Sequence, residues 1–434
     1  MNNDRLPPQT KYIVGNEACE RFSFYGIVAI LTNYATTLYG GGDLAAEEAK
    51  ETVHWFKMAC YVMPLLGAWI ADRFWGRYNT ILWLSLAYCV GHALLSMGVN
   101  TMWGLFSGLA FIAIGSGGIK PCVSAFAGDQ FAGGREHLVA RIYNWFYWSI
   151  NFGSFFAFQY IPQVAKKSYP WAFALPGIAM GLATIIFWSG RRSYIRVPPA
   201  RSAPPVDAAT RAEDRRTVWR IVGIFATVPF FWSLFDQQHT TWVQQGNVMA
   251  PFSALGLVFD GETMQSVNAV LVLVFVPLFA VVAYPLLERA GIRMTSLRKM
   301  GCGFFLAGAS FLAAAWVQAR LDAHEPLSVG WQFLQYGLLT AGEVLISTTG
   351  LAFAFTQAPA RLKSIIMSFW SLAVALGNLF AALCMRINAH SVRATKLQEL
   401  FFYAAVVTVA GIMFVIIARK FPERDAQPDP ISPP

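Results

Sequence analysis

The sequence predicts an all-α integral membrane protein with twelve transmembrane helices, divided into two six-helix bundles. The first observation is composition, because 56% of the 434 residues are hydrophobic and only 13% are charged, against about 25% charged in soluble proteins. The mean hydropathy of +0.45 agrees with this class. The second observation is that the apolar segments are about 20 residues long, which is the length that an α-helix needs to cross the hydrocarbon core.

The apolar segments occur in two groups of six. With approximate ends they cover 12–39, 52–72, 79–98, 102–128, 140–161, 170–190, 218–245, 265–288, 299–319, 328–357, 362–385 and 398–418. The longest interruption, 191–217, is polar, basic and rich in proline, so it cannot span a membrane. The expected domains are an N-terminal bundle (1–190), this linker (191–217), a C-terminal bundle (218–419) and a tail (420–434).

Lys and Arg are distributed unequally between the two sets of loops. One set collects most of them and includes the N-terminus, the 191–217 linker and the residues after 419. The positive-inside rule places that set in the cytoplasm. We therefore expect a multi-pass protein of the plasma (inner) membrane with both termini cytoplasmic. The net charge of +9 does not predict nucleic-acid binding, because the basic residues flank apolar segments and suit an anionic lipid leaflet.

The cysteines and histidines show no metal-binding spacing. All six Cys lie in or beside apolar segments without a CxxC pair, and the six His are scattered without an HExxH motif. The sequence also lacks a recognisable nucleophile and base set for a hydrolase within the membrane. We therefore expect no metal, no cofactor, no disulfide and no enzymatic activity.

Three charged residues occupy one turn of the first apolar segment. Glu17, Glu20 and Arg21 share a helix face at spacings of three and four residues. A charge near the bilayer centre costs about 2.5–3.5 kcal/mol, so these groups need partners or a water-filled cavity. Lys120, inside the fourth segment, needs an anion for the same reason. A static ion pair that fixes helix packing is the structural alternative, but the number of groups favours a transporter.

Several motifs resemble known transport families. The stretch from Gly67 to Arg77 resembles the loop motif of the major facilitator superfamily. Seven further motifs resemble, in order, the signatures of the proton-dependent oligopeptide transporter family within that superfamily. They are Glu17-x-x-Glu20-Arg21-Phe-x-Phe-Tyr25-Gly26, Gly115 to Phe131, Phe146-Tyr147-x-x-Ile150-Asn151-x-Gly153-Ser154, Phe231-Trp232-Ser-Leu-Phe-Asp236, Gln265-Ser-Val-Asn268, Gly342-Glu343-x-x-x-Ser347, and Ala358-Pro-Ala-Arg361-x-Lys363 ahead of Trp370.

The resemblance implies proton-coupled symport of di- and tripeptides into the cell by alternating access. The implied partners are a small peptide, protons and the lipid bilayer, with a functional monomer and no nucleic acid. The implied proton-coupling residues are Glu17, Glu20, Arg21, Lys120, His54 and Asp236. The implied peptide-binding residues are Arg21, Tyr25, Tyr61, Lys120, Asn151, Trp232, Asn268, Glu343, Ser347 and Trp370.

The charge pattern fits that implication. Glu343 is a lone carboxylate in the tenth segment, and a peptide is a dipolar ion. A carboxylate at one end and cations such as Arg21 and Lys120 at the other would suit it. In the structural alternative, the Thr340 and Ser347 hydroxyls bind a buried Glu343 carboxylate.

His54 and Asp236 form a second proton-coupling candidate, because histidine titrates in the physiological range. A structural hydrogen bond is the alternative for this pair.

Four features depart from the family pattern, two of which are Lys57 in the second segment and His239 shortly after Asp236. Val28 stands where the family's first helix usually has a basic residue, which predicts that one outer salt bridge is absent. The 191–217 linker is too short and polar for the two extra helices that many bacterial members insert.

Two other functions remain open from the sequence. A carrier of nitrate or another small anion would use the basic residues but would not need Glu343. A peptide sensor that does not transport could retain the whole site.

Overall fold

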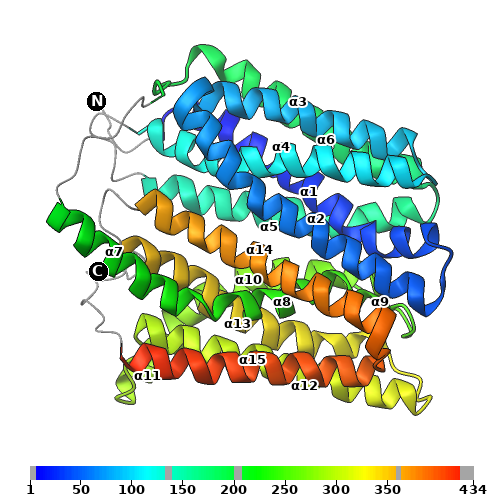
Figure 1. Cartoon of the computed structure of the whole chain (residues 1–434). Helices are drawn as coiled ribbons and strands as arrows, with labels where there is room; N and C mark the ends of the chain where they lie inside the picture. The colour runs from blue at the N-terminus through cyan, green and yellow to red at the C-terminus, as the bar shows by residue number, and fades with distance from the viewer. Residues whose placement is uncertain (1–5, 132–138, 200–207, 358–362, 421–434) are drawn as a thin grey trace. The chain divides into compact units, whose positions relative to one another are not determined.

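The computed structural model describes residues 6–131, 139–199, 208–357 and 363–420 (Figure 1). Several predicted features lie outside these ranges, namely the 358–362 part of the last motif, the 200–207 part of the linker and the tail from 421. The chain separates into two compact units, Met1–Pro204 and Pro205–Pro434. Each unit is built almost entirely from helices within the described residues.

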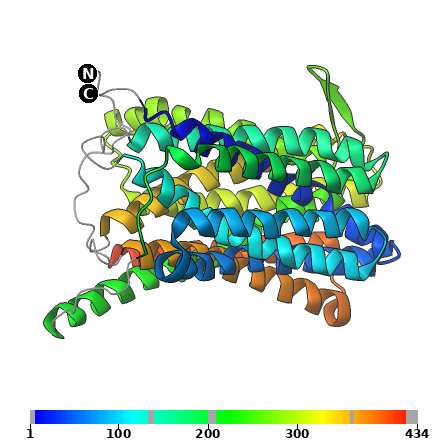
Figure 2. The same ribbon diagram turned by 90° about the horizontal axis from the view of Figure 1, so that it is seen from above.

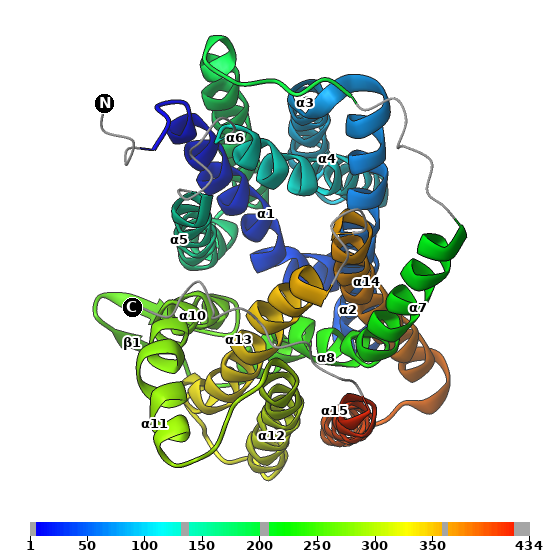
Figure 3. The same ribbon diagram turned by 90° about the vertical axis from the view of Figure 1, so that its left-hand side faces the viewer.

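The described part of the first unit consists of long helices that pack side by side. They are α1 (Thr10–Leu38), α2 (Gly42–Ile70), α3 (Gly76–Met97), α4 (Met102–Asp129), α5 (Val139–Ala165) and α6 (Tyr169–Ser189). Helix α1 packs against α5 and α6, and α4 packs against α2 and α3, as the end-on view in Figure 3 shows. A π-helical turn, Ala71–Trp75, joins α2 to α3, and Gly76 follows it with a φ of +72°.

The contact between α2 and α4 depends on glycine. A methyl group at Gly67 would overlap the backbone of Gly118, so the α2 and α4 backbones are in direct contact at this point. The loop motif and the Gly-rich fourth signature thus meet at one contact, and α4 is held in the position from which Lys120 projects.

We expect Gly67→Ala to lower the thermal stability of the purified protein by about 1–3 kcal/mol, because the added methyl group must separate α2 from α4. Gly181→Ala in α6 is the matched control, since a methyl group there meets no atom within 4 Å. Thermal unfolding in detergent, followed by thiol-reactive fluorescence, measures both. Equal midpoints for the two variants would contradict the close contact.

The second unit contains interrupted helices. The predicted span 218–245 is divided among α7 (Ala208–Phe225), α8 (Val228–Phe235), a 3-10 turn (Asp236–His239) and α9 (Thr241–Gly246). Pro229 lies in the first turn of α8, where its missing N–H costs nothing. The predicted span 265–288 consists of a 3-10 turn (Thr263–Gln265), α10 (Ser266–Leu278), a π-helical turn (Phe279–Ala283) and α11 (Tyr284–Arg289). Pro277 and Pro285 explain this break, because neither can donate an intrahelical bond.

The remaining helices of this unit are continuous. They are α12 (Ser296–Asp322), α13 (Gln332–Gln357), α14 (Lys363–Ile387) and α15 (Lys396–Arg419). Helix α12 packs against α13 and α15, α8 packs against α14, and α10 packs against α13. A two-stranded antiparallel hairpin, β1 (Phe252–Ala254) and β2 (Leu257–Phe259), connects α9 to α10.

The first part of the predicted linker packs against the first unit. After a 3-10 turn (Gly190–Arg192), the chain is fixed by reciprocal hydrogen bonds between the Gln130 side chain and the backbone of Ile195, at 2.9 and 3.0 Å. Arg196 stacks over the Tyr78 ring at 3.7 Å. At its other end the predicted linker is helical, because Ala208–Thr217 are the first turns of α7.

Eight helical segments within the described residues are long and apolar enough to cross a membrane. One of them, Gly42–Met97, contains both α2 and α3. Helix α1 is not among the eight, and it carries Glu17, Glu20 and Arg21. The described residues therefore contain several apolar helices of membrane-spanning length, whereas the number of twelve stays a prediction.

Candidate functional site

Arg21 binds both carboxylates of the first motif. Its Nε lies 3.1 Å from Glu17 Oε1, and its Nη2 pairs with Glu20 Oε2. All three side chains are buried. The shared helix face therefore creates a compact group of two acids and one base, in which protonation of one carboxylate would leave the other paired with Arg21.

Lys120 does not pair with these carboxylates. Its Nζ lies over the rings of Phe24 and Tyr61, at 4.2 and 4.5 Å from the ring centroids. No ion pair joins it to a carboxylate in the part of the chain that the structure describes. Cation–π contacts stabilise an ammonium without neutralising it. Lys120 thus makes no direct ion pair with Glu17 or Glu20 in the described structure, and its expected pairing with them stays a prediction.

The fifth-helix motif brings α5 against the charged turn of α1. A methyl group at Gly153 would lie 2.6 Å from the Ala18 carbonyl oxygen and 3.1 Å from Arg21 Cβ. This close approach explains the glycine in the motif. Asn151, two residues earlier, is buried and donates to the Tyr147 carbonyl at 2.9 Å. Tyr25 packs against Phe24 and Phe158 at centroid distances of 5.4 Å.

Glu343 is held by an amide in the second unit. Asn268 Nδ2, on α10, donates to Glu343 Oε2 at 2.7 Å and to Thr340 Oγ1 at 3.0 Å, both on α13. No cation forms an ion pair with Glu343 within the described residues. Close packing of α12 on α13 at Gly342 and Gly303 fixes the position of this turn. The sequence predicted both residues as site residues, and the structure joins them directly.

Two predicted aromatic residues also meet in this unit. The rings of Trp232 and Trp370 are perpendicular, with centroids 6.0 Å apart. Gly350 leaves room for the Trp370 ring, because a methyl group there would overlap it. Ser347 lies three residues before Gly350, so the two occupy one face of α13.

Asp236 has a partner that the sequence reasoning did not identify. Asn378 Nδ2 on α14 donates to Asp236 Oδ2 at 2.6 Å, and both residues are buried. His239 Nδ1, one turn from Asp236, lies 2.6 Å from Gln265 Oε1. Gln265 belongs to a predicted motif, and an amide within an apolar segment is the signal that could have identified Asn378. His54 is fully buried on α2 of the first unit; its pairing with Asp236 stays a prediction.

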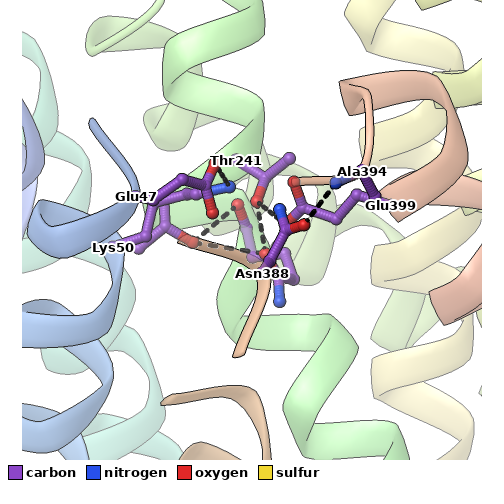
Figure 4. Close-up of polar contacts among 8 residues, drawn as sticks. Glu47, Lys50, Thr241, Asn388, Ala394 and Glu399 are labelled. Atoms are coloured by element: carbon purple, nitrogen blue, oxygen red, sulfur yellow. Dashed lines mark hydrogen bonds and ion pairs between the residues drawn. The ribbon is translucent and has the colours of Figure 1, made fainter. Parts of the chain in front are cut away.

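Further polar contacts were also not predicted (Figure 4). In the first unit, the fully buried Lys50 pairs with Glu47 at 2.6 Å. In the second, Thr241 Oγ1 donates to Glu399 Oε1 at 3.3 Å, and Asn388 Oδ1 accepts from the Ala394 amide at 2.7 Å. Their spacings match no motif, so they could not be singled out from the sequence.

Comparison with known proteins identifies the family. A sequence model of the POT family matches residues 78–210 and 205–400 of this chain. Solute carrier family 15 member 1 of Oryctolagus cuniculus is 33% identical over 408 residues, covering 80% of this chain and 57% of the relative. Peptide transporter family 1 of Drosophila melanogaster is 34% identical over 362 residues, covering 73% and 48%. The chain thus spans about half the length of the curated relatives that it matches.

Solved structures agree with the sequence relatives. An auto-inhibited POT family peptide transporter is 35% identical, with a TM-score of 0.90 and coverage of 98% of this chain and 100% of that structure. The POT family transporter PepTSo is 37% identical, with a TM-score of 0.90 and coverage of 96% and 98%.

The apolar helices and their buried charges define a multi-pass α-helical membrane protein. The chain belongs to the POT family. Its family and relatives are transporters and not enzymes, in agreement with the prediction from the sequence.

Proposed function

We propose that this protein is a proton-coupled symporter that carries di- and tripeptides into the cell. One observation carries the proposal. Lys120 and Glu343 are opposite charges on apolar helices, and neither has an ion-pair partner among the described residues. Such charges are costly in a membrane unless they serve a ligand or an ion. A zwitterionic peptide supplies a carboxylate for one and an ammonium for the other.

In this proposal each end of the peptide has its own binding residues. Arg21 and Lys120 bind the carboxylate, whereas Glu343, oriented by Asn268, binds the amino group. Asn151 contacts the amino end as well. Tyr25, Tyr61, Trp232, Ser347 and Trp370 line the space for peptide side chains. The similarity to Peptide transporter family 1 of Drosophila melanogaster supports the substrate class.

The proposed membrane arrangement follows the sequence. Twelve transmembrane helices form two six-helix bundles, joined by the basic linker, in the plasma (inner) membrane. Both termini lie in the cytoplasm, where the positive-inside rule places them. The transporter acts as a monomer that alternates between outward-open and inward-open states.

Proton coupling is assigned to the two carboxylates on α1. Arg21 neutralises one negative charge, so the group carries a net negative charge when both acids are ionised. Binding of one proton removes that charge and lets the occupied transporter change state without moving an uncompensated charge. Interacting carboxylates of this kind titrate as a pair and not as independent sites.

An anion carrier is the second candidate, and one observation argues against it. A nitrate carrier has no use for a carboxylate in its binding site, yet this chain has Glu343, which accepts a hydrogen bond from Asn268 at 2.7 Å. Exchange of labelled dialanine in proteoliposomes separates the two. We expect unlabelled dialanine and trialanine to compete and nitrate to have no effect. Competition by nitrate alone would contradict the peptide assignment, and absence of exchange with retained dialanine binding would indicate a sensor.

A second proton-sensitive pair is proposed at His54 and Asp236. We expect His54→Gln and Asp236→Asn each to flatten the pH dependence of uptake, with the double variant no worse than either single one, because residues acting as one unit are non-additive. Asn378→Leu removes the amide that donates to Asp236 and should flatten the same profile. Initial uptake rates between pH 5 and 8 measure the effect, over the range in which histidine titrates. Additive losses at His54 and Asp236 would mean that the two act separately.

A further inference from the structure

The hairpin between α9 and α10 has an apolar surface that the helices do not cover. Residues 248–259 contain no charged side chain, and Ser253 is the one hydroxyl among them. Strands β1 and β2 pair Phe252 with Phe259 and Ala254 with Leu257. The tip residue, Leu255, is 100% exposed. A water-facing loop of this composition would be an aggregation hazard.

The tip residue is also unfavourable for its backbone. Leu255 and Gly256 form the two-residue turn with φ values of +54° and +76°. Such turns favour Asn, Asp or Gly at both positions, because a branched apolar side chain is disfavoured at positive φ. Leu255 therefore serves neither the turn nor the packing of the chain. An apolar environment outside the protein that accommodates the Leu255 side chain would explain why leucine occupies this position.

The base of the hairpin is fixed to the helices beside it. Ala250 pairs with the α12–α13 connection through hydrogen bonds of 2.9 Å to the Leu327 carbonyl and 2.8 Å from the Val329 amide. The Phe252 and Phe259 rings stack at 5.0 Å, and both contact Phe333 on α13. The hairpin thus extends crosswise to the helices of its unit, away from α10 (Figures 2 and 3).

An aromatic band marks the same end of these helices. Trp316 and Trp331 are both partly exposed, with ring centroids 5.1 Å apart. Arg320 stacks on Trp316 at 5.1 Å. Exposed Trp beside a basic residue is typical of the boundary between hydrocarbon and headgroups. Helix α10, which follows the hairpin, exposes Val270, Val274 and Leu278, as a lipid-facing helix does.

We propose that this hairpin is a lipid anchor, which lies along the bilayer interface and inserts Leu255 among the acyl chains. Its two strands have outer edges that no further strand covers in the described part of the chain. Open edges are not tolerated in the hydrocarbon core, so the strands lie at headgroup depth, where water can satisfy them. The leaflet is the outer one in the orientation proposed above. The inference rests on the membrane location alone, and not on the transported substrate.

The test is nitroxide accessibility in the full-length protein, reconstituted into phosphatidylcholine and phosphatidylglycerol nanodiscs. The six native cysteines are replaced, and Leu255→Cys is labelled. Ala323→Cys, exposed between Asp322 and His324 at the same end of the unit, is the aqueous control. Val274→Cys on α10 is the lipid control. Val258→Cys gives a second site on the hairpin.

We expect the ratio of oxygen to nickel-chelate accessibility at 255 to lie well above that at 323 and near that at 274. A ratio equal to that at 323 would overturn the anchor. Dipolar broadening between labels in discs that hold two copies would overturn it in favour of hairpin pairing between copies. An immobilised label that neither reagent reaches would overturn it in favour of a contact within the chain.

Discussion

Glu20→Gln will abolish proton-driven peptide accumulation but leave peptide exchange across the membrane. The substitution removes one titrating carboxylate from the group in which Arg21 binds Glu17 and Glu20. The remaining carboxylate stays paired with Arg21, so the group carries no net charge and no longer needs a proton to neutralise it. The neutral group resembles the protonated state of the native transporter, which is the state that changes conformation with peptide bound.

The expected effect is large. One proton that moves through 100 mV supplies about 2.3 kcal/mol, which corresponds to roughly 40-fold peptide accumulation. In the variant this ratio falls to one, whereas exchange of labelled for unlabelled dialanine continues. Glu288→Gln, on the exposed end of α11, is the matched control and should accumulate peptide normally. Loss of exchange in well-folded Glu20→Gln would mean that Glu20 binds peptide instead.

Glu343→Gln will weaken the binding of peptides with a free amino group. Because Glu343 lies on an apolar helix without a cation partner in the described structure, the proposed peptide ammonium is its counter-charge. Removal of one partner from a buried charge pair costs about 2–5 kcal/mol. We therefore expect dialanine affinity to fall by more than tenfold, as measured by tryptophan fluorescence or calorimetry.

The matched ligand for this test is N-acetyl-dialanine, which lacks the positive charge. Its weak binding should change little in Glu343→Gln. Asn268→Ala should give an intermediate loss for dialanine, because it removes the donor that orients Glu343 and leaves the charge in place. An equal loss of both ligands in Glu343→Gln would show that the carboxylate supports the fold of α13 and not the amino group.

The sequence predicted the membrane class because apolar length and charge are local properties. Most helix ends agree with the predicted segments to within a few residues, as for α4 and α15. The breaks at 226–227 and 279–283 were not predicted, since hydropathy does not respond to a proline that interrupts hydrogen bonding. Pro229, Pro277 and Pro285 are the sequence signal for these interruptions.

The structure gives the contacts of the predicted site residues, whereas their roles in a site stay predictions. Spacing along α1 placed Glu17, Glu20 and Arg21 on one face, which follows from helix geometry alone. The surroundings of Lys120 depend on how α1, α2 and α4 pack, and there the Phe24 and Tyr61 rings lie beside the ammonium. Asn378 lies more than 140 residues from Asp236, so only the fold could reveal that contact.

The central claim is that a proton gradient drives peptide entry, and one measurement tests it most directly. Purified protein is reconstituted into liposomes with an alkaline, electrically negative interior, and labelled dialanine is added outside. We predict uptake above the equilibrium level that collapses when an uncoupler is added, and that is absent from liposomes without protein. Uptake that only equilibrates dialanine, unchanged by the gradient or the uncoupler, would contradict the proposal of proton-coupled symport.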